Sequence, residues 1–338
     1  MRIVLCYPVE AKHVDQIQAA VPAAEIVPTA QTGEGMDRIA TEILAADIFC
    51  GHAKVPMPWR EVVDQGRLRW IQSSAAGMDH CLVPAVVDSD IIVTSASGVL
   101  ADQVAEQTLA LLLGVLRNLP TFFRAQQSRD YTRRPTRDLH QATIGIVGLG
   151  GNGRRLVEVL EPFRTRILAT DLFPVDKPAQ VEELWSPDGL ERMLGKVDIL
   201  ILAAPLTELT RNMINSDTLA LMKRGSILIN VARGGLVVED DLVDALESGQ
   251  LAGAGIDVAA EEPLPTDSAL WEQQNLIITP HVGGQSAWRI DQMTDLFCEN
   301  LRRDQAGEPL LNLLTDKRLG FPIPPTARVI STDNSDQV

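Results

Sequence analysis

Three residues whose side chains could do chemistry each come shortly after an apolar run typical of a β-strand. Arg233 follows SILINVA, Glu262 lies a few residues after AGAGIDV, and His281 follows NLIITP. The carboxyl ends of parallel strands meet at one edge of a sheet, so a cation, a carboxylate and an imidazole are expected together there. A guanidinium can hold an anion, and an imidazole exchanges protons near neutral pH. The pattern predicts acid–base chemistry on an anionic substrate.

Each of these residues also has a structural interpretation. Arg233 could form an ion pair with Glu261, Glu262 or Asp257. His281 could be a hydrogen-bonded histidine at a strand end. If these interpretations were correct, unrelated structural residues would have to meet by chance at one edge of the sheet. A single functional site is therefore favoured.

A second motif, GLGGNG, follows a strand-like run and opens a helical one. Gly148 permits a tight turn, Gly150 lets the backbone approach a pyrophosphate, and Gly153 lets the helix pack closely on the strand. The N–H groups at the start of the helix can then bind phosphate. A glycine-rich structural turn is the alternative, and Asn152 is polar where an apolar residue is usual. The context predicts dinucleotide binding.

Asp171 lies about twenty residues beyond the motif, at the end of the next predicted strand. A carboxylate there can accept hydrogen bonds from the adenosine ribose, and it would repel a 2′-phosphate. The following stretch offers one cation, Lys177. The alternative is that Asp171 faces solvent or caps a turn. We predict NAD as the cofactor.

The elements that must position these residues alternate along the whole chain. Apolar runs predict strands at 2–7, 47–51, 69–74 and 91–95, and then six more, the first where a second alternation starts within 143–160 and the others at 166–171, 197–205, 226–232, 252–258 and 275–280. Helical spacing lies between them, for example at 14–21, 36–46 and 239–249. This β-α-β alternation predicts parallel sheets.

Two long helices are predicted where the two series of strands meet, at 101–119 and 285–306, and a polar connector is predicted at 124–141. The economical architecture is α/β, with a doubly wound Rossmann NAD-binding domain inserted into a smaller flavodoxin-like α/β substrate domain, and a cleft between them. The predicted boundaries are 1–98 plus 287–330 for the substrate domain, 99–286 for the NAD-binding domain, and 331–338 for a disordered tail.

Composition excludes several classes of function. The 338 residues are 45% hydrophobic and carry a net charge of −15, which disfavours nucleic acid and anionic membranes as partners. No apolar run is long enough to span a bilayer, and the N-terminus does not resemble a signal peptide, so a cytoplasmic protein is expected. The four cysteines show no metal or redox spacing, so no metal site is expected.

From about residue 70 to 315 the chain resembles the D-2-hydroxyacid dehydrogenase family, which includes phosphoglycerate dehydrogenase and glyoxylate/hydroxypyruvate reductase. The resemblance rests on QSSAAGMDH, the glycine motif, NVARGGLV, GIDVAAEEPLP and TPHVGG, in this order. It implies an NAD-dependent oxidoreductase in which Arg233 binds the substrate carboxylate and carbonyl, His281 is the acid–base group and Glu262 is its partner. A carboxylate beside the histidine favours its protonated form, which can donate a proton to a 2-keto acid.

The resemblance also implies the binding residues. Ala76 and Gly77 would hold the substrate carboxylate with their N–H groups, together with Arg233. The residues implied in cofactor binding are Gly148, Gly150, Gly151, Asn152, Gly153, Asp171, Pro205, Val231, Ala232, Arg233, Asp257, His281, Gly283 and Gly284.

Several relatives remain as alternatives. Glu262 argues against formate dehydrogenases, which have glutamine there, and the length argues against the regulatory domain of many phosphoglycerate dehydrogenases. A dinucleotide-sensing scaffold similar to transcriptional corepressors, or a phosphite-type dehydrogenase, is the alternative function. The expected substrate is a small 2-keto acid of the glyoxylate, hydroxypyruvate or phosphohydroxypyruvate class, and the expected assembly is a homodimer.

Overall fold

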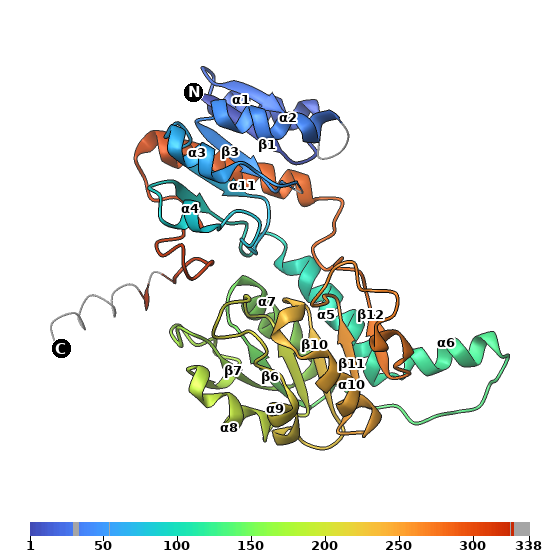
Figure 1. Ribbon diagram of the computed structural model, residues 1–338. Coiled ribbons are helices and arrows are strands. Elements are labelled where there is room, and N and C mark those ends of the chain that lie inside the picture. The colour runs from blue at the N-terminus through green and yellow to red at the C-terminus, as the bar shows by residue number, and fades with distance from the viewer. Residues whose placement is uncertain (30–33, 54, 325, 328–338) are drawn as a thin grey trace. The chain divides into compact units, whose positions relative to one another are not determined.

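The computed structural model of the protein describes residues 1–29, 34–53, 55–324 and 326–327 (Figure 1). It divides into two compact units. Among the described residues, the first contains Met1–Leu100 and residues 286–327, and the second contains Ala101–Gln285. These limits differ by two residues and by one residue from the predicted boundaries at 98 and 287. The predicted tail at 331–338 lies outside the described residues.

The first unit is built on a sheet of five parallel strands in the order β2-β1-β3-β4-β5. The strands are β1 (Arg2–Cys6), β2 (Glu25–Pro28), β3 (Ile48–Gly51), β4 (Trp70–Ser73) and β5 (Ile92–Thr94). The sequence predicted four of them and missed β2. This strand lies at an edge, is only partly buried and ends in Pro28, so it lacks the apolar run that marks the others.

Alternation of side chains along β1 separates two hydrophobic clusters, one on each face of this sheet. Ile3 and Leu5 pack in one cluster with residues of α1 and α11, and Val4 and Cys6 pack in the other with residues of α2, α3 and α4. The helices are α1 (Ala11–Ala20), α2 (Glu34–Glu42), α3 (Trp59–Gln65), α4 (Pro84–Val87) and α11 (Arg289–Ala306). The last is shorter at its start than the predicted helix 285–306.

The second unit contains seven parallel strands in the order β12-β11-β10-β9-β6-β7-β8. They are β6 (Thr143–Val147), β7 (Arg166–Thr170), β8 (Val181–Trp185), β9 (Ile199–Leu202), β10 (Ser226–Asn230), β11 (Leu251–Ile256) and β12 (Leu276–Ile278). The doubly wound α/β fold predicted from the sequence is confirmed. The predicted count of six strands was wrong, because β8 is a seventh.

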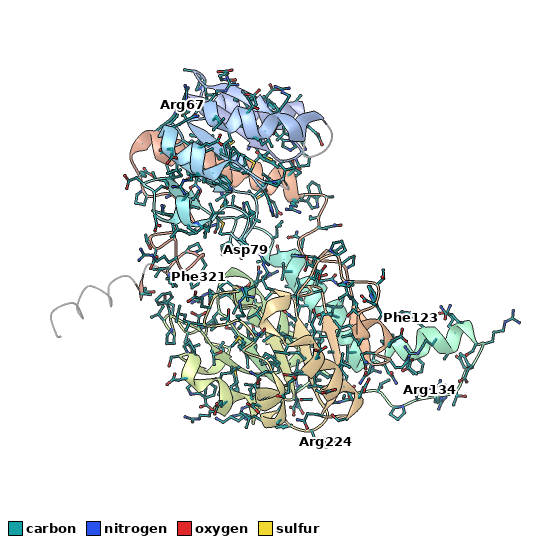
Figure 2. All side chains as sticks on the ribbon, viewed as in Figure 1. Arg67, Asp79, Phe123, Arg134, Arg224 and Phe321 are labelled. Atoms are coloured by element: carbon teal, nitrogen blue, oxygen red, sulfur yellow. The ribbon has the colours of Figure 1, made fainter. Side chains whose placement is uncertain are left out.

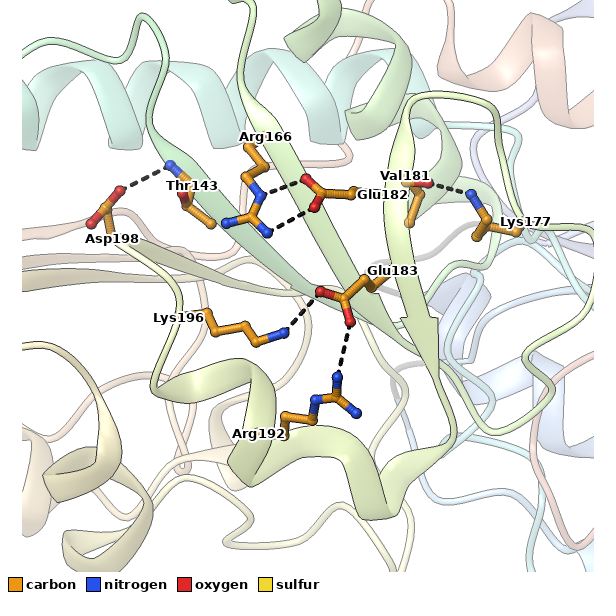
Figure 3. Close-up of polar contacts among 9 residues, drawn as sticks. All are labelled: Thr143, Arg166, Lys177, Val181, Glu182, Glu183, Arg192, Lys196 and Asp198. Atoms are coloured by element: carbon orange, nitrogen blue, oxygen red, sulfur yellow. Dashed lines mark hydrogen bonds and ion pairs between the residues drawn. The ribbon is translucent and has the colours of Figure 1, made fainter.

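The missed strand β8 is a charged edge strand. Figure 3 shows Glu182 paired with Arg166 of the neighbouring strand, and Glu183 paired with Lys196 and Arg192 at 2.8 and 3.4 Å. Ion pairs that water reaches add little stability, but charges on an edge discourage pairing with another chain. They also remove the apolar run by which a strand is recognised in a sequence.

Helices cover both faces of the second sheet. One hydrophobic cluster joins the strands to α5 and α7, and another joins them to α8, α9 and α10. The helices are α5 (Ala101–Leu116), α6 (Leu119–Gln127), α7 (Gly151–Leu160), α8 (Leu190–Leu194), α9 (Ser216–Leu221) and α10 (Glu239–Glu247). The strand order reverses between β9 and β6, the place where open α/β sheets bind ligands at the carboxyl ends of their strands.

The predicted helix 101–119 corresponds to α5, which ends at Leu116, and a second helix, α6, begins at Leu119. Asn118 adopts a left-handed conformation, with φ of 58°, in the turn between α5 and α6. Pro120 lies in the first turn of α6. Proline lacks a backbone donor and is tolerated only at a helix start. The connector predicted at 124–141 therefore begins inside α6. In Figure 1, α6 extends away from the body of its unit.

None of the helices in the described ranges has the length and apolar character needed to cross a membrane. Among the same residues, no group of three or more His, Cys, Asp or Glu side chains is arranged to hold a metal ion.

Candidate active site

The structure places Arg233, Glu262 and His281 beyond the carboxyl ends of three neighbouring strands. Arg233 follows β10, Glu262 lies in the loop after β11, and His281 lies three residues after β12. Since β10, β11 and β12 are adjacent and parallel, the three residues share one edge of the sheet. Parallel strands thus deliver the cation, the carboxylate and the imidazole to the same side.

His281 and Glu262 form a direct pair. His281 Nδ1 lies 2.7 Å from Glu262 Oε2, and the two side chains are 46% and 40% exposed, so solutes can reach them. The other carboxylate oxygen of Glu262 accepts a hydrogen bond from the Ala259 N–H at 3.1 Å. An ionised carboxylate only accepts hydrogen bonds, so Nδ1 must carry the hydrogen. This leaves Nε2 as the ring nitrogen that can exchange a proton with a substrate.

The backbone at His281 is held by Asp257, which is 2% exposed. Its main-chain oxygen accepts the His281 N–H at 2.7 Å, and its carboxylate accepts the N–H groups of Val282 and Gly283 at 3.0 and 2.7 Å. The carboxylate also accepts the Thr279 hydroxyl at 2.6 Å. His281 itself has φ of 52°, a conformation that residues other than glycine rarely adopt. Asp257 therefore holds the turn that presents the imidazole.

Two residues that the sequence analysis missed extend this support. Gln107 of α5 donates to the Thr279 hydroxyl at 2.8 Å, which joins the turn to a helix far away in the chain. Glu239, at the start of α10, accepts the Ala260 N–H at 2.7 Å and holds the loop that carries Glu262. No local pattern marks either residue, because each acts through a contact made only in the folded chain.

The loop that carries Arg233 is fixed by Asn230, the last residue of β10. Its side chain accepts the Ala232 N–H at 3.1 Å and donates to the Arg233 carbonyl at 2.9 Å. Arg233 Nη1 donates to the Ala232 carbonyl at 2.7 Å. Gly234 lies so close to the next loop that a Cβ would come within 1.9 Å of the Ala259 carbonyl carbon. The loops bearing Arg233 and Glu262 are therefore packed directly together.

The glycine motif forms the turn from β6 into α7. A Cβ on Gly148 would lie 2.8 Å from the Ala204 backbone, and one on Gly153 would lie 2.0 Å from the Gly148 carbonyl. At Gly150, by contrast, a Cβ would meet nothing within 4 Å, and this residue is exposed. Gly150 is also the N-cap of α7, and as a glycine it has no side chain to bond the N–H groups of the first turn. Open space over uncapped N–H groups at a helix start fits a bound pyrophosphate.

Asp171 follows β7 and braces this turn. Its carboxylate accepts the Leu149 N–H at 2.6 Å and the Phe173 N–H at 2.8 Å. The second contact is the turn cap considered as an alternative in the sequence analysis. Each carboxylate oxygen has a further lone pair, so these bonds leave room for a ribose hydroxyl.

The remaining predicted cofactor residues lie along the same edge of the sheet. Pro205 follows β9, and its carbonyl accepts a hydrogen bond from the Thr210 hydroxyl at 2.7 Å. Val231 and Ala232 follow β10, and each is 9% exposed. Gly151 and Asn152 are in the first turn of α7, and Gly283 and Gly284 follow His281. Ala76 and Gly77 belong to the first unit, where they lie in the loop after β4.

Comparison with known proteins identifies the relatives of this chain. The family model described as "D-isomer specific 2-hydroxyacid dehydrogenase, NAD binding domain" matches residues 109–283. A glyoxylate reductase of Pyrococcus horikoshii is 34% identical over 72% of this chain and 75% of its own length. A D-3-phosphoglycerate dehydrogenase of Methanocaldococcus jannaschii is 28% identical over 89% of this chain, which spans 57% of that longer protein.

A solved structure of the same family is also similar to this chain. The D-isomer specific 2-hydroxyacid dehydrogenase of Xanthobacter autotrophicus Py2, determined in complex with NADPH and MES, is 27% identical with a TM-score of 0.78. The match covers 94% of this chain and 99% of that one.

Proposed function

This chain belongs to the D-2-hydroxyacid dehydrogenase family, whose members are oxidoreductases that use a nicotinamide dinucleotide, and from this premise we propose that it reduces a small 2-keto acid with NADH. The substrate class is glyoxylate, hydroxypyruvate or phosphohydroxypyruvate. The observation that carries the proposal is the 2.7 Å contact between His281 and Glu262, beside the loop that bears Arg233.

A nicotinamide, when bound, would supply the hydride that reduces C2 of the keto acid, and this chain's own residues supply the proton and bind the negative charge. His281 donates a proton from Nε2 to the carbonyl oxygen, while Glu262 accepts the hydrogen bond from Nδ1–H and holds the ring in place. Arg233 binds the substrate carboxylate and stabilises negative charge on the oxygen. Ala76 and Gly77 hold the carboxylate with their N–H groups.

The experiment is a panel of 2-keto acids with NADH, followed at the absorbance of the reduced cofactor. Glyoxylate, hydroxypyruvate, phosphohydroxypyruvate, pyruvate and branched 2-keto acids cover the expected range. His281→Ala should lower kcat by about 10²–10⁴-fold while NADH binding stays intact. Absence of turnover with every keto acid, or a fully active His281→Ala variant, would show the proposal to be wrong.

We also propose that NAD is preferred over NADP and that Asp171 is responsible. Its carboxylate already sits beside the glycine turn, 2.6 Å from the Leu149 nitrogen, and a 2′-phosphate there would face a negative charge. The relative from Xanthobacter was solved with NADPH, so membership of the family does not decide this choice.

The assembly we propose is a homodimer formed through the arm of the second unit, defined as residues 119–138. Phe123 and Tyr131 in this arm are 58% and 102% exposed. Large aromatic side chains left in water on one segment are typical of a surface that binds another protein. A second copy of the chain would bury them. Light scattering should give twice the mass of one chain, and Phe123→Asp should convert it to a monomer, whereas Leu221→Asp at another exposed apolar position should not.

A further inference from the structure

Two histidines of the first unit lie at the place where its sheet can bind a ligand. In the order β2-β1-β3-β4-β5 the chain reverses its direction of winding between β1 and β3. Open α/β sheets bind ligands beyond the carboxyl ends of their strands at such a reversal. His52 is the first residue after β3, so it stands at this position.

The second histidine, His80, stacks on the first. The ring centroids of His52 and His80 are 3.9 Å apart, and the planes meet at 21°. Both residues are partly exposed. Neither takes part in the acid–base chemistry proposed above, so the pair needs another explanation.

The pair is joined to the loop after β4. His80 Nε2 lies 3.3 Å from the Ser73 hydroxyl, which also bonds the backbone of Ala75. This contact joins the two ends of the loop 73–80, which contains Ala76 and Gly77. Asp79 of this loop is labelled in Figure 2. The N–H groups proposed to hold the substrate carboxylate therefore belong to the same closed loop as His80.

The chemistry of the pair suits an anion. An imidazole ring carries at least one N–H whether or not it is charged, so the stack can donate hydrogen bonds to the oxygens of an anion. The exposed Asp79 is the charged side chain next to His80 in the chain. In a chain with a net charge of −15, an anionic ligand needs local donors of this kind.

We propose that the His52–His80 stack binds an anionic oxygen group, a carboxylate or a phosphate, at the far end of the 2-keto acid. The inference rests on the proposed reductase function and narrows its substrate class. The C1 carboxylate is bound at Ala76 and Gly77, and the stack binds the anionic group attached to C3 or C4. The preferred substrates are then 2-keto acids with a second negative charge.

The test compares substrates that differ at the far end alone. One pair is hydroxypyruvate and phosphohydroxypyruvate, and the other is 2-oxobutyrate and oxaloacetate. The measured quantity is the preference, the ratio of kcat/KM for the anionic member to that for the uncharged member. The wild type should prefer the anionic member of at least one pair, and which pair shows it distinguishes a phosphate from a carboxylate.

The variants His52→Gln and His80→Gln should lower this preference at least tenfold, mainly through KM. The control is His140→Gln, an exposed histidine of the second unit, which should leave both the preference and the activity unchanged. Thermal unfolding and NADH binding show whether each variant is folded. Should His80→Gln fail to fold because the Ser73 contact is lost, His52→Gln, which keeps that contact, decides the question.

Two results would overturn the inference: a wild type without preference in either pair, or variants that reduce both members of a pair equally. The second result would mean that the stack only packs the loop. If glyoxylate is still reduced in these cases, the reductase function stands and the inference about the histidines alone fails. If no keto acid is reduced, both fail.

Discussion

At the scale of single residues, the proposed chemistry depends on groups whose partners are already in place. Glu262 divides its two oxygens between His281 and the Ala259 N–H, and Asp171 divides its oxygens between two backbone N–H groups. A side chain held in this way loses little freedom when a ligand binds.

Arg233→Lys should raise KM for the keto acid about tenfold or more and should lower kcat. Lysine keeps the charge but lacks the planar fork that binds a carboxylate through two hydrogen bonds. Steady-state kinetics with glyoxylate measures the effect. Arg224→Lys is the matched control, because Arg224 precedes β10 at the opposite end of the same strand and donates to the Ser248 carbonyl. Equal effects of the two variants would remove Arg233 from the substrate site.

Asp171→Asn should lower the preference for NADH over NADPH by about tenfold or more, since a hydrogen bond to a charged group contributes about 1.5–3 kcal/mol. Asparagine keeps the shape and one acceptor oxygen, so the turn at Leu149 is disturbed less than by alanine. The ratio of kcat/KM for the two cofactors is the measurement, because any loosening of the turn affects both alike. An unchanged ratio would mean that Asp171 only braces the turn.

At the scale of elements, the turn from β6 into α7 assigns different tasks to its glycines. Gly153 permits close packing on the Gly148 carbonyl, whereas Gly150 faces open space. The two requirements, packing within the protein and access for a ligand, can be separated by adding one methyl group at each position.

Gly150→Ala should leave stability within about 1 kcal/mol, the scale of an N-cap change, and should raise KM for NADH about tenfold or more. Gly153→Ala should destabilise the unit by about 1–3 kcal/mol, because its Cβ would lie 2.0 Å from a backbone oxygen. Thermal unfolding and NADH titration of both variants test the pair. A Gly150→Ala variant with normal NADH binding would contradict the proposed position of the pyrophosphate.

At the scale of the whole molecule, each unit has its own sheet with a hydrophobic cluster on both faces. All four cysteines are buried in these clusters or beside them. Burial raises the pKa of Cys6 and Cys298 to about 11 and of Cys81 to about 12, and it also raises the pKa of Cys50 well above its ordinary value. The thiols are therefore structural.

Because the thiolate is the reactive form, the folded protein should react very slowly with a disulfide reagent at pH 8. With a pKa of about 11, roughly one Cys6 thiol in a thousand is ionised there. The release of thionitrobenzoate should be slow in buffer and should reach four equivalents in denaturant. Rapid labelling of any cysteine in the folded protein would contradict the burial of the thiols.

The sequence by itself determined those features that depend on local patterns. Apolar runs and the context of the glycine motif predicted the parallel α/β fold, the position of the nucleotide turn and the delivery of Arg233, Glu262 and His281 after successive strands. Such patterns are readable because a buried strand must be apolar along its whole length and a tight turn needs glycine. Strands β2 and β8 were missed because both lie at edges and their sequences, EIVP and VEELW, mix polar residues or proline with apolar ones and so form no apolar run.

Only the tertiary structure decided which residues support the site. Gln107 and Glu239 reach the loops of His281 and Glu262 from helices that lie 172 and 21 residues away in the chain from the residues they bind. The stack of His52 on His80 likewise joins two loops through neighbouring strands. Contacts between distant segments follow from strand order and register, which single-residue patterns do not encode. For that reason the residues proposed to be catalytic were visible in the sequence. The side chains that hold them were not visible, and neither was the contact between the two histidines proposed to select the substrate.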